Sequence, residues 1–454
     1  MPESQKLYRF SLSIILGIFL ALYSWNAWQY NTWWAYDGGA HIGYIRGLAE
    51  DGRLPDKNEN YLAWHEPLYY FLNAGAVKGL ERFGVPDRWV NKLLQLESAV
   101  WAWLFVGASG ILAWQLSRKR WRTRFVMAFA GSLFITSALA RYVTNEVMWQ
   151  SLLLWWLVLF FYWGMFDMTN WNKQRWFALT AGLLLLVWIK LSGFILVSAL
   201  VLWLFWLGFV KRSWRPVWVA LIVSAVVGLG YSPWLIHKEK LYGTAFTINN
   251  FEIAKTSAMT KMPWSFYTGI DKSIFRSPFW PAGKGSFWSM FYASSLTDYD
   301  NVFGNYEQEK ISAPWRLKTE NGRLISLPYM ARSIALVWWS LPLAGGLMIG
   351  GLLFLYLVIF KQKKPEHIFL GILVAGLVTA LLYNTYQYPY LDRGIMKTIL
   401  IVSFFPLGAI LASEGWNYFW QKWNNKNRRL VFLAGGLYFV LWAIISLSVM
   451  VLPG

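Results

Sequence analysis

Long apolar segments recur along this 454-residue chain and are separated by shorter polar segments. A helix needs about 20 apolar residues to cross the hydrocarbon core of a bilayer, because each residue adds about 1.5 Å along its axis. The pattern therefore predicts an all-α polytopic membrane protein with about 11 transmembrane helices. The predicted spans are Leu12–Trp28, Leu93–Leu116, Phe125–Leu139, Val147–Phe166, Phe177–Ile189, Phe194–Val210, Val217–Ile236, Ile334–Phe360, Ile368–Tyr383, Ile395–Leu411 and Leu430–Leu452.

Two segments between the predicted spans are long. Residues 29–92 hold two stretches with apolar positions at helical spacing, His41–Ala49 and Pro67–Phe83, joined by the polar turn EDGRLPDKNEN. Such amphipathic helices lie along the membrane surface. Residues 237–332 are rich in aromatic residues, glycine and proline, so no regular structure is predicted there. We find no internal repeat and no appended soluble domain, which predicts a single membrane domain over residues 1–454.

The composition agrees with a membrane protein and excludes some chemistry. The chain is 57% hydrophobic, its mean hydropathy is +0.36, and it contains no cysteine. Disulfides, thiolate zinc sites and thiol nucleophiles are therefore excluded. The first apolar segment has no A-x-A-like cleavage site after it, so we expect a retained helix. No nucleotide-binding or metal-binding motif is present, and we expect neither a cofactor nor a metal.

The net charge of +19 is explained by topology. If the N-terminus is cytoplasmic and the spans alternate, the inner segments hold 19 of the 42 basic residues but three of the 23 acidic residues. This asymmetry is the positive-inside pattern of membrane proteins, and it leaves no basic patch for nucleic acid. We therefore expect a multi-pass protein of the bacterial inner (plasma) membrane, with a cytoplasmic N-terminus.

The same topology places the unusual polar residues on the outer side. Acids and bases at the ends of several helices on one membrane face indicate a shared cavity that opens to that face. These residues are Asp37, His41, His65, Glu66, Arg141, Asn145, Glu146, Lys190, Asp298, Asp300, Asp392, Arg393 and Lys397.

Asp37 follows the aromatic run Trp33, Trp34 and Tyr36 and precedes two glycines. It could cap a helix that begins near Gly39, since Asp is a favoured N-cap residue. The aromatic side chains would also exclude water from the carboxylate, and the glycines would let a substrate approach. A carboxylate in that setting can act as a general base.

The other outer residues could also have purely structural roles. His65 could be a satisfied interfacial histidine, and Glu66 could mark the start of a helix at Pro67. Lys190, in the turn WIKLSG, could extend to the membrane interface. Arg393 and Lys397 lie one helical turn apart and could share a face that binds phosphate oxygens, or could anchor a span end. Asp37, His41 and His65 could bind a cation, although their spacing matches no recognised site.

Asp298 and Asp300 lie in the segment SSLTDYDNVF of the second long outer segment. Of these two acids, we expect at most one to face the outer site.

Several patches of the chain share one resemblance. The first outer segment reads YDGGAHIGYIRGLAEDGRLPD and then HEPLYYFL. The later patches, in chain order, are RYVTNEVMWQSLLLWWL, LTAGLLLLVWIKLSG, GYSPWLIHKEKLYGTAF, SFWSMFYASSLTDY and YPYLDRGIMKTIL. Together they resemble, in the same order, segments of the GT-C superfamily of membrane glycosyltransferases, in particular its protein O-mannosyltransferase-like and aminoarabinose-transferase-like branch. The first segment resembles the family's first extracytoplasmic loop, with His-Glu-Pro where many relatives have His-Pro-Pro.

The resemblance implies an inverting transfer of a sugar from a polyprenyl-phosphate donor to a protein, lipid or glycan acceptor at the extracytoplasmic face. By position, Asp37 corresponds to the family's catalytic Asp. Lys190, Arg393 and Lys397 are then candidates for binding the donor phosphate. The candidates for supporting or substrate-binding roles are His41, His65, Glu66, Glu146 and Asp298.

Two other classes of function remain open at this point. A transporter or flippase of a lipid-linked sugar would carry its charged residues along a path across the bilayer, whereas here they gather at one face. A non-catalytic membrane scaffold would leave that gathering unexplained. The sugar and the acceptor are not indicated by the residues.

Overall fold

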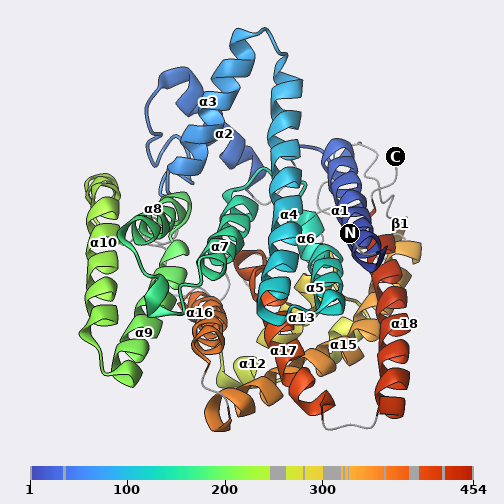
Figure 1. Cartoon of the computed structure of the whole chain (residues 1–454). Helices are drawn as coiled ribbons and strands as arrows, with labels where there is room; N and C mark the ends of the chain where they lie inside the picture. The colour runs from blue at the N-terminus through green and yellow to red at the C-terminus, as the bar shows by residue number, and fades with distance from the viewer. Residues whose placement is uncertain are drawn as a thin grey trace.

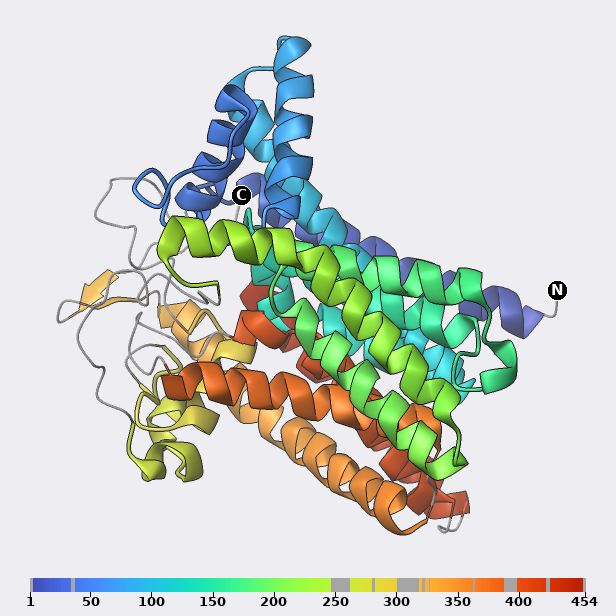
Figure 2. The ribbon, with the colours of Figure 1, turned by 90° about the vertical axis from the view of Figure 1, so that its left-hand side faces the viewer.

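The computed structural model describes residues 3–33, 37–245, 262–279, 282–299, 318–320, 323–325, 327–361, 364–387, 398–421 and 425–451. Asp300, Asp392, Arg393 and Lys397 lie outside these residues, as do Trp34 and Tyr36. The described part is a bundle of helices that run side by side, with two further helices at one end (Figures 1 and 2).

The first half of the chain is helical almost throughout. Its elements are α1 (Glu3–Gln29), α2 (Gly38–Asp51), α3 (Leu68–Arg82), α4 (Asp87–Ser117), α5 (Arg120–Gly131), α6 (Phe134–Leu139), α7 (Asn145–Tyr162), η1 (Met168–Asn170), α8 (Lys173–Ile189), α9 (Gly193–Lys211) and α10 (Trp214–Tyr242). The second half contains α12 (Trp264–Thr268), η2 (Lys272–Phe275), α13 (Phe287–Leu296), α15 (Leu327–Phe360), α16 (Pro365–Gln387), η3 (Thr398–Ile401), α17 (Phe404–Trp420) and α18 (Asn425–Met450).

The prediction of a helical polytopic membrane protein is confirmed. Seven helices in the described residues are long and apolar enough to cross a membrane, and each coincides with a predicted span. They lie at Gln5–Gln29, Asp87–Ser117, Gly193–Lys211, Trp214–Tyr242, Ala331–Phe360, Pro365–Gln387 and Arg429–Met450. The other four predicted spans correspond to shorter helices, so the count of 11 stays a prediction.

Two predicted spans were placed wrongly. Phe125–Leu139 is not one helix, because the chain leaves the helical conformation at Leu133, which separates α5 from α6. Ile395–Leu411 was expected to be continuous, but α17 begins at Phe404 after the short helix η3. Both segments are apolar, as predicted. Apolar composition does not show where a buried helix is interrupted, since neighbouring helices can satisfy the backbone groups that the interruption leaves without an intrahelical partner.

The second long outer segment also differs from the prediction. The absence of periodicity predicted no regular structure for residues 237–332, but the segment contains α12, η2, α13 and a short hairpin of β1 (Lys318–Glu320) and β2 (Arg323–Ile325). The two strands pair antiparallel, with Thr319 opposite Leu324. α13 is mainly buried and mixes apolar residues with buried serines, so it lacks the amphipathic pattern that identifies a surface helix.

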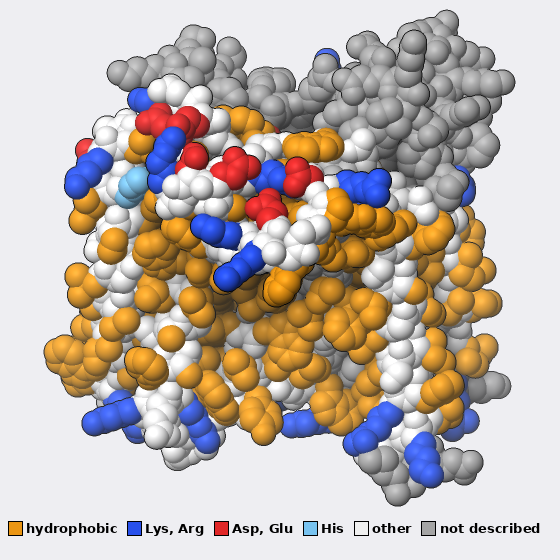
Figure 3. Space-filling view, turned by 90° about the horizontal axis from the view of Figure 1, so that it is seen from above, with side chains coloured by type: hydrophobic (Ala, Val, Ile, Leu, Met, Phe, Trp, Pro, Cys, Tyr) orange, Lys and Arg blue, Asp and Glu red, His pale blue; other side chains and the backbone are white. Residues whose placement is uncertain are grey.

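Acidic side chains gather on one side of a broad apolar band in the view of Figure 3. The edge on the other side of the band is lined by Lys and Arg, whereas the Asp and Glu side chains lie with further Lys and Arg across the band (Figure 3). An edge with basic residues alone is expected for a protein that sits in a bilayer and follows the positive-inside rule.

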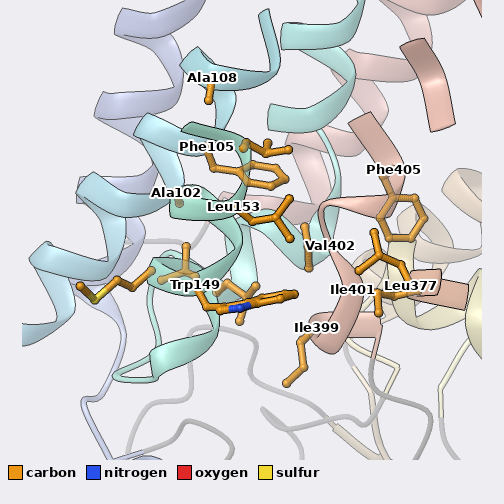
Figure 4. Close-up of a cluster of buried hydrophobic side chains, with 14 of the residues drawn as sticks. Ala102, Phe105, Ala108, Trp149, Leu153, Leu377, Ile399, Ile401, Val402 and Phe405 are labelled. Carbon is orange, nitrogen blue, oxygen red and sulfur yellow. The ribbon is translucent and has the colours of Figure 1, made fainter. Parts of the chain in front are cut away.

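The centre of the bundle is formed by α4, α7 and the start of α17. Phe105 of α4, Trp149 and Leu153 of α7, and Phe405 of α17 belong to one buried cluster (Figure 4). The side-chain amide of Gln150 donates to the carbonyl of Leu400 at 2.8 Å and accepts from the backbone N–H of Ser403 at 3.0 Å. Gln150 thereby supplies hydrogen-bond partners to the backbone groups between η3 and α17. These bonds hold the interruption of the helix against α7.

The two helices expected in the first outer segment are present. α2 corresponds to the predicted stretch His41–Ala49 and α3 to Pro67–Phe83. Their bounds differ from the predicted ones by at most a few residues. They pack on each other beside the start of α4 (Figure 1), and the rings of Tyr44 and Tyr70 stack with centroids 3.8 Å apart. Figure 2 shows both helices at the opposite end of the molecule from the N-terminus.

The end of α1 is tied to α4, which sets where the first outer segment begins. The ammonium of Lys92 donates to the carbonyls of Ala27 at 3.0 Å and Tyr30 at 2.5 Å. A cation at a helix C-terminus satisfies carbonyls that lack intrahelical partners and interacts favourably with the helix dipole. The residues that lead to Asp37 therefore start from a fixed point on the bundle.

Candidate functional site

Asp37 stands at the junction between α1 and α2, where the chain enters α2. Its backbone adopts a left-handed conformation with φ 53° and ψ 15°, which Asp and Asn tolerate better than most residues. The residue occupies the N-cap position that the sequence indicated, but its side chain makes no capping hydrogen bond. The carboxylate is instead exposed, and one of its oxygens accepts a hydrogen bond of 2.5 Å from the hydroxyl of Tyr61.

Tyr61 reaches Asp37 because the turn between α2 and α3 folds back over the start of α2. The side-chain amide of Asn60 donates to the carbonyl of Ala40 at 2.8 Å, and its oxygen accepts from the backbone N–H of Leu62 at 2.8 Å. These bonds hold the residues on both sides of Tyr61. Tyr61 was not predicted as a site residue; it directly follows the polar turn EDGRLPDKNEN and precedes the apolar residues Leu62 and Ala63.

His41 and His65 meet through a third residue. The hydroxyl of Tyr70 lies 2.9 Å from Nδ1 of His41 and 3.1 Å from Nδ1 of His65. A single hydroxyl has one proton to donate, so one imidazole accepts from Tyr70 while the other donates to it. The turn EDGRLPDKNEN thus returns His65 to the start of α2, and Tyr70 is the residue that joins the two histidines.

Both imidazoles are held in the neutral form. Burial lowers the pKa of His41 to about 4, with the Asp37 carboxylate opposing this shift and the Lys190 cation adding to it. Burial also lowers the pKa of His65, and the charges of Lys190, His41 and Lys238 act in the same direction. The electrostatic influence of Asp37 and Lys190 on His41 places these three groups in one neighbourhood.

Glu66 anchors the segment and does not start a helix. α3 begins at Leu68 with Pro67 as its N-cap. The Glu66 carboxylate accepts hydrogen bonds from the ammonium of Lys238 at 3.0 Å, the hydroxyl of Tyr231 at 2.8 Å and the backbone N–H of Leu191 at 3.0 Å. It therefore joins the first outer segment to α10 and to the turn between α8 and α9.

The ion pair of Glu66 and Lys238 is buried, and the two opposite charges compensate each other. The side chains of Glu66 and Lys238 are 2% and 1% exposed. Burial by itself would raise the pKa of the Glu66 carboxyl, but the charge of Lys238 and the hydrogen bonds from Lys238 and Tyr231 lower it below its usual value. Lys238 and Tyr231 were not predicted, since Lys238 lies just after the predicted span Val217–Ile236 in the polar run HKEK.

Lys190 and Glu146 form an ion pair with each other. Lys190 is the C-cap residue of α8, and Glu146 lies in the first turn of α7. The Lys190 ammonium donates to the Glu146 carboxylate, and both side chains are largely buried. Asn145 joins the same elements, since its amide donates to the carbonyl of Ile189 at 3.1 Å. The predicted tight turn at Lys190 is present, and the lysine charge is already compensated within the protein.

Asp298 lies in a second group of residues, just after α13. It is buried and lines a pocket formed by α6, α13 and η3. Asp300, the other acid of this segment, falls outside the described residues. Within the described part of the chain, no group of three or more His, Asp or Glu residues is arranged to hold a metal ion.

The comparisons with known proteins were made at the level of families, curated sequences and solved structures. No family model matches the chain, and no curated protein matches it. The ArnT structure from Cupriavidus metallidurans bound to undecaprenyl phosphate is 16% identical with a TM-score of 0.47, and the alignment covers 93% of this chain and 62% of that one.

Two structures of an archaeal oligosaccharyltransferase are also similar. The AglB structure from Archaeoglobus fulgidus, in complex with an inhibitory peptide and a dolichol-phosphate, is 10% identical with a TM-score of 0.50 and covers 100% of this chain and 57% of that one. The Archaeoglobus fulgidus oligosaccharyltransferase tethered to an acceptor peptide is 12% identical with a TM-score of 0.50, covering 98% and 55%. This chain thus spans little more than half the length of these proteins and shares their fold.

We predict that breaking the Glu66–Lys238 pair from one side destabilises the protein strongly. Lys238→Met leaves a buried carboxylate without its cation, which costs about 3–5 kcal/mol. The double variant Glu66→Gln/Lys238→Met removes both charges and should be less destabilised than Lys238→Met alone. Thermal unfolding of the purified variants in detergent measures both effects, and equal unfolding temperatures for wild type and Lys238→Met would contradict the prediction.

We also predict that His41 makes the stability depend on pH. Between pH 6.5 and 4 the unfolded chain binds a proton at His41 that the folded protein does not bind, so the stability falls as the pH is lowered through this range. The loss amounts to about 3 kcal/mol at pH 4. Thermal unfolding between pH 4 and 7.5 should show a smaller loss for His41→Gln than for wild type. Parallel pH curves for the two proteins would show that His41 is not the source.

Proposed function

We propose that this protein transfers a sugar from a polyprenyl-phosphate donor to an acceptor at the extracytoplasmic face of a bacterial inner membrane. The observation that carries the proposal is the exposed carboxylate of Asp37, which is not used for helix capping and is oriented by a hydrogen bond from Tyr61. The GT-C fold supports it, since the solved proteins with this fold were bound to a dolichol-phosphate or to an acceptor peptide.

The proposed reaction is a single displacement with inversion. The acceptor nucleophile attacks the anomeric carbon, the bond from that carbon to the phosphate oxygen breaks, and the proton of the nucleophile passes to Asp37. The leaving group is a lipid phosphate, which departs as an anion and needs no general acid. One carboxylate is therefore sufficient, unlike the pair of carboxyl groups that glycosidases require.

Tyr61 acts as a positioning residue in this proposal. Its hydroxyl binds one oxygen of Asp37 and leaves the other oxygen of the carboxylate for the acceptor proton. A base that is held in one orientation loses less entropy when the reacting groups come together. The hydroxyl also donates to an ionised acceptor, which is the stronger class of hydrogen bond.

The leaving phosphate needs cations near the site. Lys190 lies close enough to influence His41 and His65, but it is paired with Glu146, so its charge is shared. We therefore assign the larger part of the phosphate binding to Arg393 and Lys397, which lie outside the described residues. His41, His65 and Glu66 support Asp37 by holding the first outer segment together, as their hydrogen bonds indicate.

We predict that Asp37→Asn abolishes sugar transfer while the protein still folds and binds the donor. Asn tolerates the left-handed backbone conformation at this position, so the change removes the base and keeps the local fold. Incubation of the purified protein with a set of polyprenyl-phosphate sugars and candidate acceptors, followed by mass spectrometry of the acceptors, measures the transfer. Full activity of Asp37→Asn would overturn the role of Asp37, and movement of the lipid across proteoliposomes without a covalent product would favour a flippase.

We predict that Tyr61→Phe lowers kcat about tenfold and leaves KM for the donor nearly unchanged, because the lost hydrogen bond orients the base and does not hold the substrate. Steady-state kinetics with the donor and acceptor found for the wild-type protein measure both constants. Tyr162→Phe is the matched control, since Tyr162 is exposed at the far end of α7 from Glu146. A change in KM alone would contradict a positioning role for Tyr61.

A further inference from the structure

The turn between α4 and α5 concentrates positive charge that the proposed sugar transfer does not use. It lies at the end of α4 that is remote from α3, next to the start of α1. Figure 2 shows the N-terminus at the opposite end of the molecule from α2 and α3. Within seven positions, the turn and the start of α5 hold five basic residues: Arg118, Lys119, Arg120, Arg122 and Arg124.

Two of these five residues attach the turn to α17. The ammonium of Lys119 donates to the side-chain oxygen of Asn417 at 2.6 Å. The guanidinium of Arg122 forms a buried ion pair with the carboxylate of Glu414. The turn is therefore fixed on the bundle, and the only one of its basic residues that these contacts neutralise is Arg122.

The other three residues lie on two neighbouring aromatic rings. The guanidiniums of Arg120 and Arg124 are 5.3 Å and 5.4 Å from the ring centroid of Tyr8 in α1. The guanidinium of Arg118 is 6.0 Å from the ring of Trp114 in α4. The rings of Tyr8 and Trp114 are themselves in contact, with centroids 5.7 Å apart. Three cations are thus held together where α1, α4 and α5 meet, a place that we call the arginine corner.

The arginine corner lacks the anion that would balance its charge. Among the described side chains, no carboxylate lies within ion-pair distance of Arg118 or Arg124. The Nε atom of Arg124 is buried and has no hydrogen-bond partner there. An aromatic ring attracts a guanidinium but does not take up its N–H groups as a carboxylate would, so these groups can still donate to an anion.

The start of α5 favours an anion at the same place. α5 has 12 residues, no acidic residue in its first turn and no side-chain cap from Lys119 at its N-cap position. Its first backbone N–H groups and its helix dipole therefore attract negative charge. Arg120 and Arg124 lie one turn apart on α5, and side chains on a helix lean toward its N-terminus. A phosphate at this helix start would meet both the backbone N–H groups and the guanidiniums.

We propose that the arginine corner binds the phosphate of an anionic phospholipid, with the acyl chains against the apolar surface of α1 and α4. Leu7 and Phe10 flank Tyr8 in sequence and are exposed, and the exposed Ile111 lies on the same face of α4 as Arg118, two turns before it. A soluble anion would use the arginines alone, whereas a phospholipid uses both the charged and the apolar surface. Basic sites beside membrane helices attract anionic lipid headgroups. The site is remote from Asp37 and does not rest on the proposed function.

Lipid binding by the purified full-length protein tests this assignment. Delipidated protein in detergent is titrated with phosphatidylglycerol, and with zwitterionic phosphatidylethanolamine of the same acyl chains, and binding is measured by native mass spectrometry. We expect Arg118→Gln/Arg124→Gln to bind phosphatidylglycerol about tenfold or more weakly than wild type, because two cations near the phosphate are lost. Tyr8→Leu keeps every charge but removes the ring that holds two guanidiniums, so we expect binding about threefold or more weakly. Tyr8→Phe keeps the ring and should bind like wild type.

Lys173→Gln/Lys211→Gln is the matched control, because it removes the same charge from two exposed lysines on the same predicted side of the membrane. An equal loss of binding in the two double variants overturns the site, since diffuse charge would then explain the binding. Equal binding of the two lipids by wild type also overturns it, as does displacement of phosphatidylglycerol by an equal concentration of inorganic phosphate. Thermal unfolding without lipid shows whether each variant is folded, and Tyr8→Leu decides the question if Arg118→Gln/Arg124→Gln is not.

Discussion

The buried ion pair of Glu66 and Lys238 is the interaction on which the arrangement of the outer site depends. It joins the first outer segment to α10, and the second oxygen of Glu66 binds the backbone of the turn between α8 and α9. Apart from this link, α3 packs against both α4 and α8. A buried carboxylate is stable only when its oxygens are satisfied, so the pair admits few alternative positions for the segment.

The groups around Asp37 follow from that anchor. Because Glu66 is fixed, its neighbour His65 is brought to the hydroxyl of Tyr70, which also contacts His41 one helical turn after Asp37. The turn before His65 then places Tyr61 on the Asp37 carboxylate. The site therefore depends on one segment that closes on itself, while the bundle supplies Lys238, Tyr231 and the backbone of Leu191 as fixed points.

The ion pair of Lys190 and Glu146 changes the view of the charged residues at the outer face. Lys190 was expected to bind the donor phosphate and Glu146 to have a supporting or substrate-binding role, and in the structure they form an ion pair between α7 and α8. Charges that compensate one another in a region of low dielectric stabilise the protein and contribute less to binding an external ion. In the proposed function, most of the phosphate binding therefore falls to residues other than Lys190.

The order of apolar and charged segments was sufficient to predict a helical membrane protein, two outer helices and the gathering of reactive groups on one side, because burial in lipid requires long apolar helices. It also identified Asp37, His41, His65 and Glu66. It could not show that Tyr61 and Tyr70 join them, that Glu66 pairs with Lys238 172 positions away, or that one predicted span breaks at Leu133. Those features depend on which side chains meet across the bundle, and only the tertiary structure decides such contacts.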